Sequence, residues 1–281
     1  MTHARCSRRS VPRLSDIGEL GLLAELEGRG LVHAIENDAA QIEGVVVTQD
    51  ALVEGVHFRL DWITWRDLGF RAAAVNLSDL AASGATPDGL IVSVGAPAST
   101  LVADVVELYE GIAEAGVRVL GGDTTRADSL LLSVTAIGRS DRVPGRGGAR
   151  PGDKLVVTGP LGAAGAAFRR RSFVRPPLRL DEGRRLAAHA HAMLDLSDGI
   201  ARDAGHVAGR SGCRLVIDLD KIPLAPGAEP DDLAFGEDYE LLAAVADSDG
   251  FTEIGHCEAG EGVTLLRNGQ PVELAAYEHF A

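Results

Sequence analysis

The chain is poor in aromatic residues and has no long apolar run. Aromatic side chains make up 4% of its 281 residues and 34 residues are glycine, so we expect an aliphatic core with close backbone contacts. No apolar stretch approaches the roughly 20 residues that a membrane-spanning helix needs. The basic start M-T-H-A-R-C is followed by no apolar segment. We therefore expect residues 1–14 to be a disordered tail and not a secretory signal.

Cysteine is also scarce. Cys6, Cys213 and Cys257 lack the spacing of metal ligands and cannot all pair with one another, which favours a reducing, cytoplasmic location. The formal net charge is −14, from 41 acidic and 27 basic residues. This charge argues against binding to nucleic acid or to an anionic membrane surface, and it suits a protein whose carboxylates hold cations.

Lysine is nearly absent. Lys154 and Lys221 are the only two, and neither lies in the G-K-[ST] sequence of a phosphate-binding Walker A loop. The segment T-G-P-L-G-A-A-G (158–165) could bind an anion at a helix N-terminus, but we expect it to serve close packing of a helix on a strand. If the protein acts on phosphates, their negative charge therefore has to be neutralised without a lysine-bearing loop.

The hydrophobic periodicity predicts an α/β (α+β) fold in two parts. We expect an alanine-rich helix over 66–84 and a buried strand over 88–96. The segment 141–152 concentrates Pro, Gly and Arg, which is typical of a domain boundary. The prediction is a boundary in this segment, with an N-terminal domain at 15–148 and a C-terminal α/β domain at 149–281.

Six aspartates stand beside small or hydroxyl residues, at expected strand ends or within the alanine-rich helix. Mg²⁺ takes oxygen ligands and is usually held by one or two carboxylates together with substrate phosphates. Carboxylates dispersed in this way predict a site for several divalent ions and a polyphosphate, and hence metal-dependent phosphoryl transfer. The six are Asp38, Asp50 (after an expected strand at 44–47), Asp79, Asp123 (in G-G-D-T-T-R), Asp195 and Asp198.

Two of these segments also have simpler interpretations. Asn76, Asp79 and Ser83 share one face of the expected helix, and this polar stripe could face solvent. Asp198 could cap the helix that follows it. A cap does not explain Asp195, because a carboxylate in a buried strand needs a cation. From the residues alone, both alternatives stay open.

The chain also carries motifs that resemble those of the thiamine-monophosphate kinase family, in that family's order. Each motif is weak alone, but together they are specific. The pair L-V-E-G-V-H-F and G-E-D-Y-E-L separates this family from aminoimidazole ribonucleotide synthetases, selenophosphate synthetases and hydrogenase-maturation proteins. The motifs are D-A-L-V-E-G-V-H-F (50–58), A-V-N-L-S-D-L-A-A-S-G-A-T-P (74–87), G-G-D-T-T-R (121–126), G-A-R-P-G-D (148–153), L-D-L-S-D-G (194–199) and G-E-D-Y-E-L (236–241).

The resemblance implies a fold, an activity and a set of site residues. The fold would be that of aminoimidazole ribonucleotide synthetase-like proteins, a homodimer formed through the strands of the N-terminal domain. The N-terminal domain would bind ATP and Mg²⁺, and the C-terminal domain would close the active site. The activity would be the ATP- and Mg²⁺-dependent conversion of thiamine monophosphate to thiamine diphosphate. Metal ligands would be Asp38, Asp50, Asp79, Asp123, Asp195 and Asp198, with Thr48 and Gln49 as auxiliary ligands. ATP would contact Gly122, Asp123, Arg146 and Ser197, and thiamine monophosphate would contact His57, Glu237 and Tyr277.

The chemistry of this reaction needs no general base. The acceptor is itself a phosphate whose second pKa of about 6 leaves it largely ionised at neutral pH. Metal ions and positioning are the usual means of catalysing phosphoryl transfer. We therefore expect direct in-line transfer, with no phosphoenzyme and no catalytic side chain beyond the ligands.

The chain departs from the family pattern at two places. The family usually carries G-D-D-A-A, whereas this chain has Glu36 and Asn37 in E-N-D-A-A, and Gln49 replaces a small hydroxyl residue. We expect these changes to weaken a metal site at most. The alternatives are a non-catalytic nucleotide- or thiamine-phosphate-binding protein, or a related ATP-using enzyme with another small acceptor.

Overall fold

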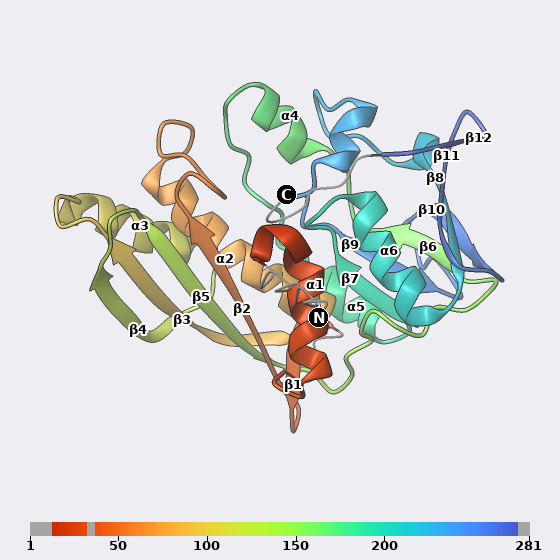
Figure 1. The fold of residues 1–281 in the computed structure, drawn as a ribbon, viewed down its shortest axis with the longest axis horizontal. Coiled ribbons are helices and arrows are strands. Elements are labelled where there is room, and N and C mark those ends of the chain that lie inside the picture. Colours follow the sequence, from red (N-terminus) through yellow and green to blue (C-terminus); the bar gives the residue numbers. More distant parts are fainter. Residues whose placement is uncertain (1–12, 33–36, 275–281) are drawn as a thin grey trace, which may run out of the picture. The chain divides into compact units, whose positions relative to one another are not determined.

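A computed structural model of the chain describes residues 13–32 and 37–274. The first segment contains helix α1 (Leu14–Gly28), which has a non-helical residue at Gly18. Residues 37–274 contain two β-sheets with their helices (Figure 1). The first sheet uses residues 40–139 and the second residues 154–272, and the residues between them form neither helix nor strand.

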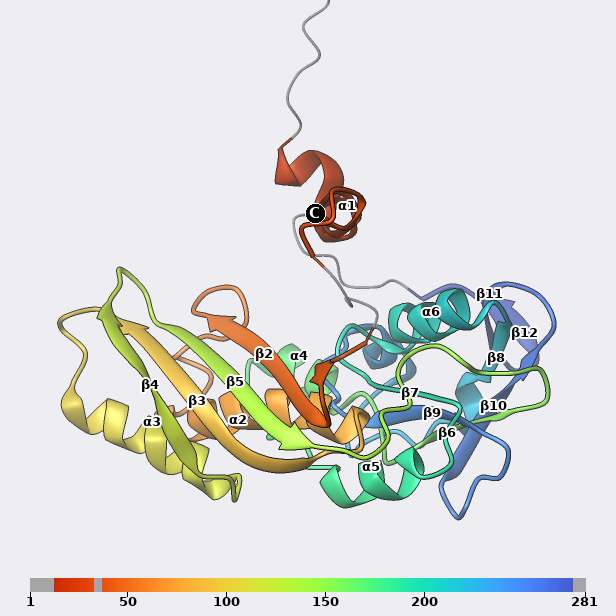
Figure 2. The same cartoon turned by 90° about the horizontal axis from the view of Figure 1, so that it is seen from below.

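The first sheet has five strands in the order β1-β2-β5-β3-β4. Neighbouring strands are antiparallel, except that β3 and β4 are parallel. Helices α2 (Trp65–Ala82) and α3 (Val102–Glu114) lie along one face (Figure 2). The strands are β1 (Ala40–Ile42), β2 (Val45–Val53), β3 (Thr86–Ala96), β4 (Val119–Arg126) and β5 (Leu131–Arg139).

Helix α2 packs against both halves of the fold. It begins after Thr64, whose side chain accepts a hydrogen bond from the backbone N–H of Asp67. Every residue from Leu68 to Ser78 is buried. One part of the helix packs on β2 and β5, and its end packs on α5 (Leu180–Ala187) and β7 (Ala192–Asp195). A polar residue on α2 is therefore held by rigid structure on several sides.

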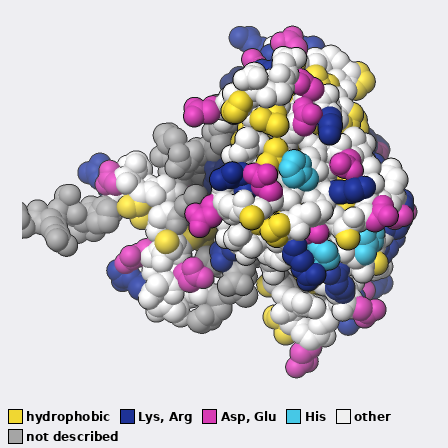
Figure 3. All heavy atoms as spheres, turned by 90° about the vertical axis from the view of Figure 1, so that its right-hand side faces the viewer, with side chains coloured by type: hydrophobic (Ala, Val, Ile, Leu, Met, Phe, Trp, Pro, Cys, Tyr) yellow, Lys and Arg dark blue, Asp and Glu magenta, His cyan; other side chains and the backbone are white. Residues whose placement is uncertain are grey.

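The second sheet has seven strands in the order β12-β11-β8-β10-β6-β9-β7, which are antiparallel except for β11 and β8. The face shown in Figure 3 carries acidic and basic side chains interspersed with one another. The other elements of this half are β6 (Lys154–Val157), α4 (Ala163–Arg169), α6 (Ile200–Ser211), β8 (Arg214–Asp218), β9 (Leu241–Val245), β10 (Thr252–Glu258), β11 (Gly262–Arg267) and β12 (Gln270–Val272), with short 3₁₀ turns at Leu219–Lys221 and Pro230–Ala234.

The predicted two-part α/β (α+β) fold is confirmed, but two motifs lie elsewhere than expected. Strand β2 continues to Val53, so Asp50 is inside a strand and not beyond its end. The motif at 121–126 is itself part of β4 and does not follow a strand. Pairing with β5 and β3 extends these segments although their Gly and Asp residues disfavour strands. Within the described residues, no helix is both long and apolar enough to cross a membrane.

Two glycines allow α2 and α3 to cross at backbone contact. A Cβ added to Gly69 would lie 1.9 Å from the carbonyl oxygen of Leu108, and one added to Gly111 would lie 1.8 Å from that of Arg66. We expect Gly69→Ala to lower the free energy of unfolding by about 1–3 kcal/mol, because the helices must separate. Thermal and denaturant unfolding measure this loss.

Gly205→Ala on α6 is the matched control, because no atom lies within 4 Å of the added Cβ. It should leave stability unchanged or raise it by up to about 1 kcal/mol through helix propensity. Equal destabilisation by the two substitutions would contradict the close crossing of α2 and α3.

Candidate active site

Three carboxylates from separate parts of the chain converge beside α2. Oxygen atoms of Asp38, Asp79 and Asp195 all lie within 4.8 Å of one another. Asp38 precedes β1, Asp79 lies on α2 and Asp195 ends β7. Asp50 on β2 is close enough for its charge to act on both Asp79 and Asp195. The structure thus brings together four of the six aspartates that were expected to bind metal.

Short polar contacts hold this carboxylate cluster (Asp38, Asp50, Asp79 and Asp195) in place. Thr48 on β2 donates from its hydroxyl to the Asp79 carboxylate, and Ser78 donates to Asp195 Oδ2 at 2.6 Å. Asn76 Oδ1 accepts the backbone N–H of Asp50 at 3.0 Å. Asn76 is fully buried. The interpretation of the polar stripe on α2 as a solvent-facing surface is therefore wrong.

The cluster carries more negative charge than its surroundings balance. Arg146 donates from Nε to Asp38 at 2.8 Å. Burial, together with the charge of Asp38, nevertheless raises the pKa of Asp195 to about 7. Burial and the charge of Asp38 likewise raise the pKa of Asp50 to about 6. Burial, followed by the charge of Asp195, holds the pKa of Asp79 well above its ordinary value.

These oxygen donors fit Mg²⁺. Hard divalent cations prefer carboxylate and hydroxyl oxygens, and a bound cation would favour the ionised forms that burial now disfavours. Asp38, Asp79 and Asp195 could share one ion, and Asp50 and Thr48 could supply further oxygens. The raised pKa values show that the ionised carboxylates lack enough positive charge around them, and a bound cation would supply that charge.

A second group of possible metal ligands follows Asp195 in the chain. Oxygen atoms of Asp198 and Asp203 and a ring nitrogen of His206 lie within 4.8 Å of one another. Asp198 does not cap α6, since the N-cap is Gly199 and no side chain caps that end. Instead Asp198 forms an ion pair with Arg202 at 3.3 Å. The capping interpretation of Asp198 is wrong, and its carboxylate lies near the cluster through the short turn after Asp195.

A cavity of about 640 Å³ is lined by residues of both halves. His57 and Glu237, two of the three predicted substrate contacts, line it together with Ser197 and Asp198. Much of the remaining wall is aromatic. The rings of Trp62 and Phe168 have centroids 5.6 Å apart, and Phe168 and Phe235 have centroids 4.9 Å apart. The cavity therefore offers an aromatic wall for a ring and polar groups at its edge.

The loop that carries Glu237 is attached to the aspartate-bearing turn. The backbone N–H of Glu237 donates to the carbonyl of Ser197 at 2.8 Å, and that of Tyr239 donates to Leu196 at 2.9 Å. Glu237 and Tyr239 have φ values of 57° and 51°, a region that costs free energy for residues other than glycine. Tyr239 also lines the cavity, and its pKa is raised by burial and then by charges that include Asp50 and Asp195. The cavity thus adjoins the carboxylate cluster.

His57 is held in a defined tautomer. Its Nδ1 lies 3.0 Å from the backbone N–H of Val53. A ring nitrogen that accepts a hydrogen bond carries no proton, so the proton of the neutral ring is on Nε2. His57 lines the cavity in this tautomer.

Some predicted site residues are not part of the carboxylate cluster or of the cavity wall. Gly122 and Asp123 lie on β4, with β5 and β3 between that strand and β2. A Cβ on Gly122 would lie 1.7 Å from the carbonyl oxygen of Val92, so strand pairing alone requires this glycine. Gln49 donates from Nε2 to Ser133 Oγ at 2.9 Å, on the sheet face opposite Thr48. Tyr277 lies outside the described residues.

Asn37 contacts the backbone near Arg146. Its Oδ1 accepts the Arg146 N–H at 3.1 Å. The side chain therefore supports the segment that carries the arginine of the cluster. Glu36, the other change in this motif, lies outside the described residues.

Sequence reasoning missed several residues that build the site. Ser78 supports Asp195, Arg71 lines the cavity, and the aromatic wall includes Trp62. The one available signal was Arg71, a charged residue within the apolar, alanine-rich run at 68–75 of this helix. The loop 158–165 holds no free anion site at its helix, because Asp238 Oδ1 accepts the N–H groups of Gly162 and Ala163.

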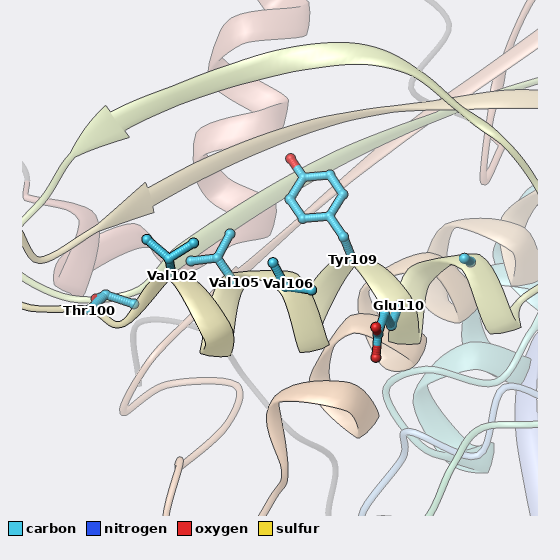
Figure 4. Close-up of a pocket in the computed structure, with 7 residues that line it drawn as sticks. Thr100, Val102, Val105, Val106, Tyr109 and Glu110 are labelled. Atoms are coloured by element: carbon cyan, nitrogen blue, oxygen red, sulfur yellow. The ribbon is translucent and has the colours of Figure 1, made fainter.

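A second, more open pocket of about 510 Å³ follows α3. Val102, Val105 and Tyr109 project to one side of the helix and Glu110 to the other (Figure 4). None of the predicted site residues lines this pocket, and it has no cluster of acidic groups.

Comparison with known proteins agrees with this architecture. Residues 36–140 match the family model described as AIR synthase related protein, N-terminal domain, and residues 150–264 match its C-terminal domain. A HypE–HypF complex contains a chain with a TM-score of 0.75 at 17% identity, which shows the shared fold alone. The fold and the carboxylate cluster define a two-domain protein of the AIR synthase-related class.

Within that class, the more similar curated proteins and solved structures point to one family. A thiamine-monophosphate kinase of Aquifex aeolicus is 32% identical over 95% of this chain and 100% of its own length. That of Escherichia coli is 34% identical over 84% of this chain and 87% of its own. A solved structure of AaThiL complexed with AMPPCP and TMP has a TM-score of 0.88 at 31% identity, covering 96% of this chain and 100% of that one. This chain belongs to the thiamine-monophosphate kinase family.

The raised pKa values predict how pH and Mg²⁺ affect stability. Between pH 3.8, the ordinary pKa of an aspartate, and about 7, the folded protein without metal binds more protons at Asp50 and Asp195 than the unfolded chain does. Its free energy of unfolding therefore falls as pH rises through that window. Because Mg²⁺ requires ionised ligands, the rise in melting temperature on adding Mg²⁺ should be larger at about pH 8 than at about pH 5.

Differential scanning calorimetry at both pH values checks this expectation. Asp195→Asn should remove most of the Mg²⁺ effect at the higher pH. An equal rise in melting temperature at both pH values, or an unchanged rise in the variant, would count against metal binding at the cluster.

The contact of Asn37 predicts the effect of restoring the family's aspartate. In Asn37→Asp the new carboxylate can still accept the Arg146 N–H, so the fold should be kept. The added charge near the cluster should lower the Mg²⁺ concentration for half-maximal activity by about two- to fivefold, the range of an exposed charge interaction. Gln270→Glu on exposed β12 adds the same charge far along the chain and is the control. An identical Mg²⁺ dependence in both variants would show that position 37 does not affect the site.

Proposed function

We propose that this protein transfers the γ-phosphoryl group of ATP to thiamine monophosphate, forming thiamine diphosphate and ADP. The observation that carries the proposal is that two features lie next to each other: a carboxylate cluster suited to Mg²⁺, and a cavity with an aromatic wall that is lined by Ser197 and Asp198, which follow Asp195 in the chain. The family membership supports the same reaction, since relatives of this length are named thiamine-monophosphate kinases. We also propose that the reaction takes place in the cytoplasm.

The side chains of the cluster would bind and orient the phosphates through metal ions. Asp38, Asp50, Asp79 and Asp195 would hold Mg²⁺, with Thr48 as an auxiliary ligand and Asp198 near a further ion. Bound Mg²⁺ would screen the charge of the two phosphate-bearing substrates and of the transition state. Arg146, next to Asp38, and Ser197, at the edge of the cavity, are placed to contact ATP phosphates. No side chain needs to remove a proton from the acceptor.

The cavity supports thiamine monophosphate as the acceptor. Thiamine joins a pyrimidine to a cationic thiazolium ring, and aromatic faces attract such cations. Trp62 and Phe168 supply aromatic faces, and Glu237 supplies a carboxylate at the wall. His57 lines the same cavity. With its rings here, the substrate can direct its phosphate past Asp198 towards the carboxylate cluster.

The position of Asp123 supports a homodimer as the active unit. Asp123 pairs with Ser93 and therefore lies on the open face of the first sheet, whereas Thr48 and Asp50 face the helices. Three strand spacings of about 4.8 Å separate β4 from β2, or about 14 Å in total. Asp123 thus cannot share an ion with Asp50 of the same chain. A partner subunit could supply it.

The edges of the sheet provide a way to form this dimer. All residues of β4 are exposed and the strand pairs only with β3. At the other edge, β1 covers only Val45–Val47 of β2, so residues 48–53 pair on one side only. Unpaired edges of this kind favour pairing with another strand. Pairing β4 of one copy with this part of β2 of another would close both edges and bring the strand of Asp123 next to the strand that carries Asp50.

A single assay tests the proposed reaction. The purified protein is incubated with ATP, Mg²⁺ and thiamine monophosphate, and the products are followed by phosphorus NMR. Thiamine diphosphate and ADP should appear in equal amounts. ADP without thiamine diphosphate would point to another acceptor. Absence of turnover with both ligands still bound would favour the non-catalytic binding protein.

Mixing two inactive variants tests whether the site is shared. Asp123→Asn and Asp195→Asn should each be nearly inactive alone. If Asp123 serves the partner's site, each mixed dimer has one intact site, and an equal mixture should recover about a quarter of wild-type activity, because about half of randomly formed dimers are mixed. Recovery is measured after subunit exchange. No recovery, with mixed dimers demonstrated by a tag on one variant, would contradict the shared site.

A further inference from the structure

Arg71 on α2 is a buried charge that contacts both predicted substrate residues of the cavity. Its side chain is 5% exposed, and it lines the cavity wall. One guanidinium nitrogen, Nη1, donates to the backbone carbonyl of His57 at 2.6 Å. The other, Nη2, pairs with the Glu237 carboxylate. Since His57 precedes α2 and Glu237 belongs to the second half of the chain, one side chain joins the two sides of the cavity.

Stability alone is a poor explanation for this arginine. A buried ion pair returns little net stability, because both charges lose their hydration. Arg71 also leaves its Nε–H buried with no hydrogen-bond partner among the described residues, which costs further free energy. An apolar residue in this apolar helix would avoid both costs. The contacts of Arg71 therefore point to a role in geometry.

The loop of Glu237 needs such a contact. Glu237 and Tyr239 both have positive φ, and such conformations persist where the surroundings determine them. The backbone of Glu237 is held by Ser197, and the ion pair with Arg71 fixes its carboxylate. Phe173 also packs near the guanidinium, with 5.9 Å between the Arg71 Cζ and the ring centroid. The guanidinium is thereby held in place by contacts with His57, Glu237 and Phe173.

We propose that Arg71 is a positioning residue for thiamine monophosphate, which holds the Glu237 carboxylate and the His57 turn in the geometry that receives the substrate's rings. Arg71 acts through these two residues, because its own donors are buried or already engaged. The inference rests on the proposed function and adds to it the element that assembles the substrate pocket from two parts of the chain. It concerns binding of thiamine monophosphate and not binding of ATP.

Kinetic constants of Arg71→Met and Arg71→Lys test this role. In Arg71→Met the KM for thiamine monophosphate should rise about tenfold or more, the range expected on losing a charged hydrogen bond. The KM for ATP should stay within about twofold of the wild type, below the roughly tenfold effect of one lost charged hydrogen bond. Arg71→Lys keeps the buried charge but cannot reach both partners, so it should show a smaller rise in the same constant. This variant also keeps the test available if Arg71→Met does not fold.

Arg175→Met is the matched control. Arg175 also joins the two halves, through Asp67 and Glu114 at 2.6 Å each, and lies over the Phe70 ring. It does not line the cavity. The substitution should lower the melting temperature without raising the KM for thiamine monophosphate. A rise equal to that of Arg71→Met would overturn the proposal, because any lost contact between the halves would then have the same effect.

A double-mutant cycle with Glu237→Gln completes the test. If Arg71 acts through Glu237, then Glu237→Gln should raise the KM for thiamine monophosphate in the wild type but add little in Arg71→Met. Two results would overturn the role of Arg71 while leaving the proposed function intact. One is an equal effect of Glu237→Gln in both backgrounds, and the other is an unchanged KM in both Arg71 variants while the wild type is active. A wild-type protein that forms no thiamine diphosphate would instead overturn the proposed function.

Discussion

The burial of several carboxylates around α2 with little opposing charge is the constraint on which the rest of the site depends. Asp38, Asp50, Asp79 and Asp195 come from a loop, a strand, a helix and the end of another strand. Their raised pKa values show that the surroundings disfavour their ionised forms. A protein gains nothing in stability from such a grouping. The grouping would become favourable with cations bound, and on the proposed function it would then hold phosphates at a defined place.

This constraint also explains why α2 is packed on so many sides. The helix carries Asp79, places Ser78 against Asp195 and Asn76 against the backbone of Asp50. Each of these contacts joins a different element to the helix. The same helix carries Arg71 and so contributes to the wall of the adjoining cavity. The carboxylate cluster and the cavity are therefore positioned by one rigid element, which suits a reaction that depends on bringing two phosphates into line.

The sequence singled out candidate site residues but not their arrangement in space. The aspartates stood out because oxygen ligands beside small residues are unusual in an apolar background, and the helix of Asp79 was predicted to within two residues at each end. The sequence could not show which of Thr48 and Gln49 faces the cluster, since this depends on the register of β2 with β5. The position of Asp123 depends on strand order, which spacing along the chain does not reveal. Arg71 was overlooked because its partners are 14 and 166 residues away.

Determining where metal binds tests the central claim most directly. Crystals grown with Mn²⁺ and a non-hydrolysable ATP analogue would locate the ions by anomalous scattering. The account predicts anomalous peaks between Asp38, Asp79 and Asp195, with the nucleotide phosphates bound to the same ions and the cavity open to their far side. Peaks elsewhere, or a bound nucleotide with no metal at these carboxylates, would contradict it.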